Sequence, residues 1–556
     1  MIENLKDISS ITSYINEEPG AALFYTAPFY KQAYSYFFKK PSYILEGYNY
    51  EEIEEVFEEV ERLKQEDFKG YGIINYETGY LLESRLKALL TKPKYPLVRF
   101  CLFKKQETEI IKTTKLLFNQ SVFSDINYEL KKLRLNISKA AYLETINKIK
   151  DYIRKGDSYQ VNFTLKTLFD FKGDISNFFF KMLFTQSAAY SAFINNQNDF
   201  ILSLSPELFF KRTEGEVFCL PMKGTVKRGK NIIEDNKNRK FLFSSEKNRA
   251  ENVMIVDLIR NDLSKLLKTG QVKAEKLFSI EKYETVFQMV SAVRAVSKDN
   301  ISLKDIFLNL FPCGSVTGAP KLRTMEIINK YEKTTRGIYT GAIGIVSKEK
   351  DIFNVPIRTI IINKQTGKGE MGIGGGIVSD SNPEDEYNEA ILKSQFLRNY
   401  TDYFVLFETM LVENNNVYLL NEHLKRLKKA AEFFLFNFDR KYIIKTINSF
   451  IEKQQTKKLV LKTELTKSGF LIIKQRKFDP PPRKVKIALS NTIMDSNNKF
   501  LYFKTSKRHW YSESFDIYKN KDIYDVVCFN EKGELTEATK CNIFIKKNNK
   551  WLTLSI

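Results

Sequence analysis

Runs typical of strands and runs typical of helices alternate along most of this chain, and the pattern restarts near residue 403. A helical pattern over 138–155 is followed by a Gly-Asp turn and a strand-like run at 159–163. Beyond 403, two strand-like runs, 403–412 and 417–420, are joined by an Asn-rich turn. The other strand-like run we single out is 22–25, and the other helical patterns are 50–66, 245–268, 304–310, 320–331 and 384–398. This alternation predicts an α/β (α+β) fold, with a further domain beginning near residue 403.

Length and composition fit a folded protein of several domains. The 556 residues are 43% hydrophobic and 13% aromatic, which excludes a disordered chain. We find no run of 18 uninterrupted apolar residues and no signal-peptide pattern at the start, so we expect no membrane segment. Five scattered cysteines without CxxC spacing indicate a reducing compartment. We therefore expect a cytoplasmic protein.

The formal net charge of +21 raises the alternative of nucleic-acid binding. The basic residues are mostly Lys, however, spread along the whole length and interleaved with acids. There is no dense basic block and no Cys/His finger. We expect no nucleic-acid partner, although the charge would attract an anionic substrate.

The run Leu-Pro-Met-Lys-Gly-Thr at 220–225 places Lys223 between Pro, Gly and Thr. A lysine can act as a nucleophile when part of its population is neutral, which burial or cationic neighbours can arrange. Other runs of unusual composition lie on either side of it. They are 156–162, 205–207, 249–262, 314–321, 336–341, 357–359, 374–378 and 384–393.

Together and in this order, these runs resemble the chorismate-binding enzyme family. The resemblance implies two antiparallel sheets packed face to face with helices outside, as in anthranilate synthase. It implies a site for chorismate, whose two carboxylates need cations and close backbone N–H groups. The residues it assigns to substrate binding are Thr317, Tyr339, Arg358, Gly374, Gly375, Gly376 and Lys393. It assigns Glu251, Glu386 and Glu389 to a Mg²⁺ ion, for which hard oxygen ligands are suitable.

The resemblance also implies a reaction sequence. Glu207 is the match to the general acid, and Lys223 to the nucleophile that attacks the ring. A hairpin over 209–220, with Glu214-Gly215 at its turn, can bring the two to one edge of a sheet. Ammonia would then replace the lysine and give 4-amino-4-deoxychorismate, for p-aminobenzoate and folate synthesis.

Three positions bear on the branch of the family. Anthranilate synthases usually carry Ala at the Lys223 position and His at the Gln288 position. Isochorismate and salicylate synthases carry a water-activating Lys at the Gln160 position. These departures favour the aminodeoxychorismate synthase branch. The alternatives are anthranilate synthase component I and a non-catalytic subunit that holds a glutaminase. We find no Cys-His-Glu amidotransferase pattern, so ammonia is expected from a separate glutamine amidotransferase subunit.

From residue 403 onward the chain resembles fold-type IV PLP enzymes, the class that contains aminodeoxychorismate lyase. The matching runs are 406–410, 423–427, 503–508, 534–539 and 542–544. The resemblance assigns Lys504 to the Schiff base, Arg426 to the PLP phosphate and Glu537 to the pyridine nitrogen. Family members continue about 50–60 residues beyond the Glu537 position. We therefore expect a partial domain, and the sequence leaves undecided whether this domain has lyase activity.

These resemblances divide the chain into three expected parts. Residues 1–125 are the N-terminal region of the synthase component, and 126–400 the chorismate-binding catalytic domain. Residues 403–556 are the partial PLP-type domain.

Overall fold

The computed structural model describes residues 6–31, 33–118, 127–267, 270–297, 301–398, 400–454, 458–518 and 522–553. By its internal contacts the chain forms two compact units. The first comprises 1–227 and 239–403, and the second comprises 228–238 and 404–556. No helix in the described ranges is both long enough and apolar enough to cross a membrane.

Two ten-stranded sheets form the first unit, and every strand pair in them is antiparallel. The first sheet has the order β18-β10-β22-β21-β12-β11-β2-β3-β7, with β9 paired to β10. Its strands are β2 (Ala22–Tyr25), β3 (Tyr34–Phe38), β7 (Thr108–Lys112), β9 (Tyr128–Leu135), β10 (Gln160–Gly173), β11 (Tyr190–Asn196), β12 (Asp199–Ser205), β18 (Gly318–Ala319), β21 (Thr359–Asn363) and β22 (Lys368–Ile377).

The second sheet has the order β15-β17-β14-β13-β20-β19-β5-β6-β4, with β16 paired to β17. Its strands are β4 (Tyr43–Gly47), β5 (Lys69–Ile74), β6 (Val98–Phe103), β13 (Leu208–Thr213), β14 (Glu216–Leu220), β15 (Met222–Lys227), β16 (Gly270–Lys282), β17 (Val286–Ser297), β19 (Ala342–Val346) and β20 (Asp351–Asn354). Strands from before and after residue 125 take part in both sheets. A short parallel pair, β1 (Lys6–Asp7) with β8 (Leu116–Leu117), lies outside them.

A buried cluster packs the two sheets against each other. Phe24 and Phe38 of the first sheet meet Tyr71 and Phe103 of the second, with ring centroids 4.9–5.9 Å apart. Aromatic contacts of this kind bury large apolar areas. The predicted arrangement of two packed antiparallel sheets is therefore confirmed.

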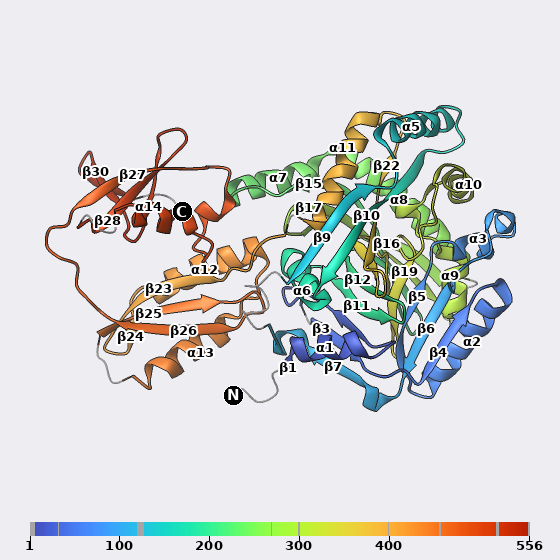
Figure 1. Ribbon diagram of the computed structural model, residues 1–556, viewed down its shortest axis with the longest axis horizontal. Helices are drawn as coiled ribbons and strands as arrows, with labels where there is room; N and C mark the ends of the chain where they lie inside the picture. Colours follow the sequence, from blue (N-terminus) through green and yellow to red (C-terminus); the bar gives the residue numbers. More distant parts are fainter. Residues whose placement is uncertain are drawn as a thin grey trace. The chain divides into compact units, whose positions relative to one another are not determined.

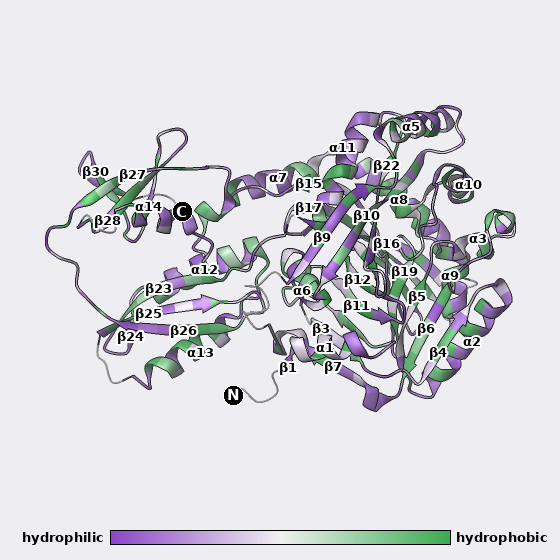
Figure 2. Ribbon diagram, viewed as in Figure 1, coloured by the Kyte–Doolittle hydropathy of each residue, from purple (hydrophilic) through white to green (hydrophobic). Residues whose placement is uncertain are grey.

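Amphipathic helices cover the outer faces. Helices α2 (Tyr50–Gln65), α8 (Glu246–Lys265) and α9 (Leu303–Leu310) contribute to one apolar cluster with the second sheet. Figure 1 shows α2 along the outer side of β4 and β6, and Figure 2 shows that it carries both hydrophobic and hydrophilic residues. Elsewhere in the described part of this unit the helices are α1 (Ile8–Glu17), α3 (Thr78–Leu82), α5 (Lys139–Arg154), α6 (Ile175–Thr185), α10 (Lys321–Tyr331) and α11 (Pro383–Ser394). Short 3₁₀ turns are η1 (Lys87–Leu89), η2 (Lys105–Glu107), η3 (Thr113–Lys115), η4 (Gly314–Val316) and η5 (Gln395–Leu397).

The second unit holds a four-stranded sheet of order β24-β23-β25-β26 and a three-stranded sheet of order β27-β28-β29. The strands are β23 (Leu406–Glu413), β24 (Asn416–Val417), β25 (Lys458–Leu465), β26 (Leu471–Lys477), β27 (Ile487–Met494), β28 (Asp525–Asn530), β29 (Leu535–Ala538) and the hairpin β30 (Phe544–Lys547) with β31 (Lys550–Thr553). The helices are α12 (Leu420–Phe434), α13 (Arg440–Ile451) and α14 (His509–Asp516), with the 3₁₀ turn η6 (Lys499–Tyr502). Helix α7 (Ile232–Ser244) belongs to the segment where the units divide.

Two local expectations need correction. The strand expected over 417–420 is only β24, which ends at Val417, because Leu419 adopts a left-handed φ of 53° and α12 begins at Leu420. The sequence analysis also missed α7. Its apolar residues do not gather on one face, so the helical period gave no signal there.

Candidate active site

A β-bulge presents Lys223. Opposite β17, Met222 pairs with Val290 and Thr225 with Gln288, so Lys223 and Gly224 together face a single residue. Gly224 has a φ of +99°, which suits glycine. Bulges re-aim a side chain and interrupt the ladder. Here Lys223 Nζ donates to Gln160 Oε1 at 3.2 Å on the other sheet and lies 3.8 Å from Glu251 Oε2.

Glu207 lies between β12 and β13 and is only 4% exposed. The hairpin of β13 and β14 has the predicted turn at Glu214-Gly215, and it brings Leu208 opposite Leu220. That pairing puts Glu207 near the start of β15.

The surroundings of Glu207 control its protonation. Burial raises the pKa of Glu207 to about 7, although a hydrogen bond from Ser315 and the charge of Lys223 oppose the rise. Ser315 Oγ donates to Glu207 Oε1 at 2.6 Å. A carboxyl group with a pKa near 7 can hold its proton at neutral pH and give it up in a reaction.

Arg358 lies in the segment between β20 and β21 and has a left-handed φ of 54°. Its Nη1 donates to Gln186 Oε1 at 2.6 Å. Burial lowers the pKa of Arg358, while Tyr283 and Glu284 act in the opposite direction. A half-buried guanidinium of this kind can bind a carboxylate.

Three consecutive glycines lie on β22, and the middle one, Gly375, faces side chains of α11. They pair with Thr164, Phe163 and Asn162 of β10. A Cβ at Gly375 would lie 3.3 Å from Glu386 Oε2 and 4.0 Å from Glu389 Oε1. A Cβ at Gly376 would come within 2.6 Å of Gln160 Nε2. A Cβ at either position would press on the polar end of a side chain, Gln160 at Gly376 and Glu386 at Gly375.

Helix α11 presents Glu386, Glu389 and Lys393. Lys393 Nζ lies 2.6 Å from Glu389 Oε1 and donates to the Gly374 carbonyl at 2.5 Å. Ser381 Oγ donates to Glu386 Oε1 at 2.7 Å. Burial and the charge of Glu389 raise the pKa of Glu386. The hydrogen bond from Ser381 and the charges of Lys393 and Lys223 act in the opposite direction but do not cancel the rise.

These carboxylates fit a divalent cation in part. Two carboxylates crowd one another beside Gly375, and a cation would relieve their repulsion. Within the described part of the chain, no three His, Cys, Asp or Glu side chains gather closely enough to hold a metal. The assignment of Glu251, Glu386 and Glu389 to one Mg²⁺ ion therefore stays a prediction.

Thr317 and Tyr339 lie deeper than the other predicted substrate ligands. Thr317 is fully buried and its hydroxyl donates to the Cys313 carbonyl at 2.9 Å. Tyr339 is 8% exposed, and its ring occupies the space beside Gly372, where a Cβ would lie 2.1 Å away. Their role in binding substrate stays a prediction.

Sequence reasoning gave no role to Ser315 or Arg336. Arg336 is 2% exposed and donates to the carbonyls of Val316 and Asn162. It also forms a buried ion pair with Glu332 at 2.7 Å. It therefore ties the turn that carries Ser315 to β10. Both residues lie inside runs singled out in the sequence, 314–321 and 336–341. Their place in these runs was the only sequence signal for a role in the site.

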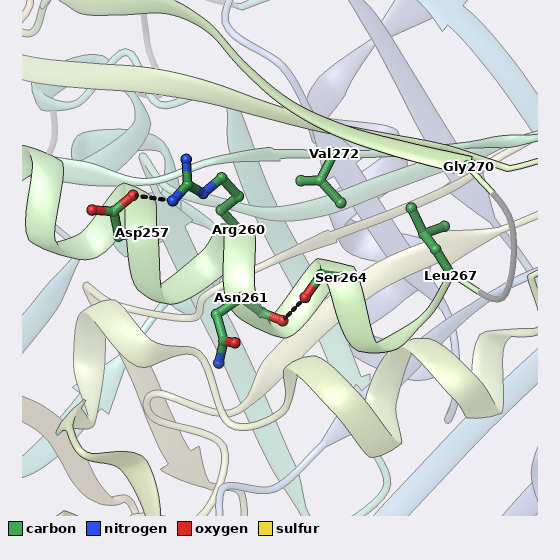
Figure 3. A pocket seen from close by; sticks show the side chains of 7 residues that line it. All are labelled: Asp257, Arg260, Asn261, Ser264, Leu267, Gly270 and Val272. Carbon is green, nitrogen blue, oxygen red and sulfur yellow. Dashed lines mark hydrogen bonds and ion pairs between the residues drawn. The ribbon is translucent and has the colours of Figure 1, made fainter.

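A surface hollow lies elsewhere, between α8 and β16 (Figure 3). Arg260 pairs with Asp257 at 3.2 Å, and Ser264 Oγ donates to the Asn261 carbonyl at 2.6 Å. The other lining residues are Leu267, Gly270 and Val272. None of the predicted site residues lines it.

In the second unit, the three predicted PLP residues lie in one electrostatic environment. Burial lowers the pKa of Lys504. The charges of Glu408 and Glu537 act to raise this pKa, and the charge of Arg426 acts to lower it. A lysine with a lowered pKa, a cation and an acid are what PLP requires, so these residues fit the cofactor.

The sequence analysis missed Glu408, which is 1% exposed on β23. Arg426 donates to both of its carboxylate oxygens, and His423 Nδ1 lies 2.8 Å from Oε2. Burial raises the pKa of Glu408, but these hydrogen bonds outweigh it and the pKa stays below its usual value. Glu408 thus fixes the direction of the Arg426 guanidinium.

Comparison with known proteins identifies the family. Residues 20–399 match the model of the chorismate binding enzyme family.

The chain belongs to the chorismate binding enzyme family.

Residues 405–556 match a second model, amino-transferase class IV. Among members of the chorismate binding enzyme family, aminodeoxychorismate synthase component 1 of Escherichia coli is 38% identical over 260 residues, which are 46% of this chain and 57% of that protein. Anthranilate synthase component 1 of Aquifex aeolicus is 34% identical over 270 residues, 48% of this chain and 54% of that protein. The chain thus spans little more than half the length of these relatives.

Among solved structures, anthranilate synthase component I from Streptococcus pneumoniae has a TM-score of 0.57 at 23% identity. The match covers 66% of this chain and 92% of that one. It supports the fold of the first unit.

Proposed function

We propose that the chain is an aminodeoxychorismate synthase component 1, which converts chorismate and ammonia into 4-amino-4-deoxychorismate. The observation that carries this proposal is the pair formed by Lys223 and Glu207. A lysine amine and a buried carboxyl group with a pKa of about 7 influence each other across the same site. The relatives named aminodeoxychorismate synthase support the same reading.

In this proposal the neutral amine of Lys223 attacks C2 of the ring, and both ring double bonds shift toward C4 as the C4 hydroxyl departs. Glu207 gives its proton to that hydroxyl, which leaves as water. Ammonia then adds at C4 and gives up a proton to the Glu207 carboxylate. Both double bonds return as the C2–N bond breaks, which releases Lys223 as a neutral amine. Glu207 is suited to the first step because burial keeps it protonated up to about pH 7.

Other residues of the chain hold the substrate. Arg358 would bind one carboxylate through its guanidinium, and backbone N–H groups of the half-buried Gly374–Gly376 segment, which lies beyond the pairing of β22 with β21, would bind the other. Glu251, Glu386 and Glu389 would hold Mg²⁺, which supplies charge stabilisation at the ring carboxylate. Gln160 would hold the Lys223 amine in place through its 3.2 Å hydrogen bond.

The ammonia donor is a second part of the proposal. A separate glutamine amidotransferase would supply ammonia, in keeping with the designation "component 1" of the E. coli relative. The product would enter p-aminobenzoate and folate synthesis.

Anthranilate synthase is the second candidate, because the Aquifex relative carries that name at 34% identity. Two observations favour the first candidate. Anthranilate formation has no need of a nucleophilic lysine at position 223, and Gln288 is engaged by Thr225 Oγ1 at 2.7 Å. An amide at Gln288 cannot act as the base that a histidine could provide.

Mass spectrometry of the products decides between them. Purified protein is supplied with chorismate, Mg²⁺ and ammonium, as wild type and as Lys223→Ala. The proposal expects aminodeoxychorismate from the wild type and its loss in the variant. Anthranilate from both proteins would establish the second candidate, and no product from either would favour a non-catalytic subunit.

For the second unit we propose PLP binding and aminodeoxychorismate lyase activity. Lys504, Arg426 and Glu537 would hold the cofactor, which supplies an electron sink when bound. Titration with PLP, followed by its visible absorbance, is expected to show binding in the wild type and a strongly weakened signal in Lys504→Ala. Equal signals from both proteins would refute the assignment of Lys504.

A further inference from the structure

The bulge that presents Lys223 needs a support outside the strand ladder. Two residues of β15 face one residue of β17, so the regular exchange of hydrogen bonds fails at this point. Backbone carbonyls left without ladder partners in a buried region need other donors. Gly224 has no Cβ, and a Cβ there would lie 3.0 Å from Asn248 Oδ1 of α8. Helix α8 is therefore the element that packs directly on the bulge.

Asn252, one turn after Asn248 on α8, supplies the missing donor. Its side chain is 1% exposed. Its Nδ2 donates to the Lys223 carbonyl at 3.1 Å and, more weakly, to the Met289 carbonyl at 3.5 Å. The amide thus bridges the bulged strand and the strand opposite it.

Ser291 fixes the orientation of this amide. The N–H of Phe278 donates to Ser291 Oγ at 3.0 Å, and Ser291 Oγ donates to Asn252 Oδ1 at 2.5 Å. Because the oxygen of Asn252 accepts from Ser291, its nitrogen is the atom that faces Lys223. Phe278 itself lies in a second irregularity, where β16 residues between Glu275 and Ser279 shift register against β17. Asn252 and Ser291 therefore connect the irregularities on the two sides of β17.

We propose that Asn252 is a positioning residue that holds the β15 bulge and so aims the Lys223 amine at the substrate ring. This inference rests on the proposed function, because it assumes that Lys223 is the nucleophile. Asn252 acts through the Lys223 backbone and does not contact the substrate. Its neighbour Glu251 lies 3.8 Å from the Lys223 amine. One turn of α8 therefore contacts both the backbone carbonyl and the side-chain amine of Lys223.

The test compares Asn252→Ala and Asn252→Asp with the wild type and with Asn261→Ala. Asp keeps the size of the side chain and can still accept from Ser291, but an ionised carboxylate has no donor for Lys223. Asn261 is a matched control, since it is an exposed asparagine on the same helix. For both Asn252 variants we expect kcat to fall roughly 30- to 100-fold, the effect of a misplaced reacting group, with KM for chorismate changed less than about threefold. Asn261→Ala should match the wild type.

A second readout does not depend on catalysis. An amine-reactive reagent is applied briefly, and labelling of the Lys223 peptide is followed by mass spectrometry against that of exposed lysines. If Asn252 holds the bulge, its loss frees the lysine, and Lys223 should label at least about threefold faster in Asn252→Ala. Unchanged labelling together with wild-type kcat would overturn the inference. A rise in KM alone, with labelling unchanged, would also overturn it.

The two proposals can fail separately. If the wild type forms no aminated product, the proposed function fails, and the labelling comparison still decides the role of Asn252. If circular dichroism shows that the Asn252 variants do not fold, Ser291→Ala replaces them. That variant keeps the Asn252 amide but removes the hydrogen bond that fixes its orientation. We expect kcat to fall and Lys223 labelling to speed up, each by a smaller factor than in the Asn252 variants. Wild-type values of both in a folded Ser291→Ala protein would then count against the inference.

Discussion

Replacing Ser315 by Ala should move the pH dependence of the reaction in a counterintuitive direction. Ser315 donates a 2.6 Å hydrogen bond to Glu207, and this bond favours the ionised carboxylate. Without it the pKa of Glu207 should rise above about 7, because burial remains and one opposing influence is gone.

The size of the effect follows from the type of bond. A hydrogen bond to a charged group contributes about 1.5–3 kcal/mol, and 1.36 kcal/mol corresponds to one pH unit. The hydroxyl can also interact with the protonated carboxyl, which reduces the difference to roughly half. We therefore expect the pKa of Glu207 to rise by about one unit in Ser315→Ala.

The assay is the pH profile of kcat/KM for chorismate with ammonia kept in excess as free base. In the proposed mechanism Glu207 acts as an acid, so the rate of the wild type should fall as the pH rises through about 7. In Ser315→Ala this fall should begin about one unit higher, so the variant is less impaired at alkaline pH than at neutral pH. Ser264→Ala, which removes a hydroxyl of the distant α8 hollow, serves as the control. An alkaline limb that stays in place, or moves to lower pH, would refute the reasoning.

Three further outcomes can be measured. Glu207→Gln should abolish activity yet be more stable than the wild type above pH 7 by roughly 3 kcal/mol in urea unfolding. The reason is that the folded pKa of about 7 exceeds the unfolded value, so the buried charge costs stability as the pH rises from about 4.5 to 7. The two proteins should be equally stable below pH 4, and no gain at pH 8 would contradict the assignment. Arg336→Met removes the ionic partner of the buried Glu332 carboxylate, which keeps a hydrogen bond from the Thr164 N–H. We expect a loss of about 3–5 kcal/mol in urea unfolding, whereas a loss below about 1 kcal/mol would show that Arg336 does not hold this region together. Gly375→Ala places a Cβ 3.3 Å from Glu386 Oε2, and we expect about tenfold more Mg²⁺ for half-maximal activity with little change in the melting temperature; an unchanged Mg²⁺ requirement would separate Gly375 from the metal.

Local features were the most predictable part of the fold. The helices expected over 50–66, 138–155 and 304–310 appear as α2, α5 and α9 with ends within about two residues, because their apolar spacing matches one buried face. The Glu214-Gly215 hairpin was also predictable, since the turn chemistry is local. By contrast, Leu419 turns left-handed inside an apolar run, and nothing in its neighbours announces that change.

The sequence by itself determined the residue types of the site and the order in which they occur. Lysine at 223, glutamate at 207 and the glycines at 374–376 specify the available chemistry, and their motifs indicated the family. Tertiary structure alone decided what these groups can do. Gln160 and Ser315 reach Lys223 and Glu207 from 63 and 108 residues away, and Asn252 supports the bulge from a separate helix.

The physical reason is that protonation and direction depend on surroundings. The pKa of Glu207 rises because folded chain displaces water from it, and that displacement is assembled from segments remote in sequence. The direction of the Lys223 amine depends on one residue more in β15 than in the strand it pairs with, which only the pairing of the two strands defines.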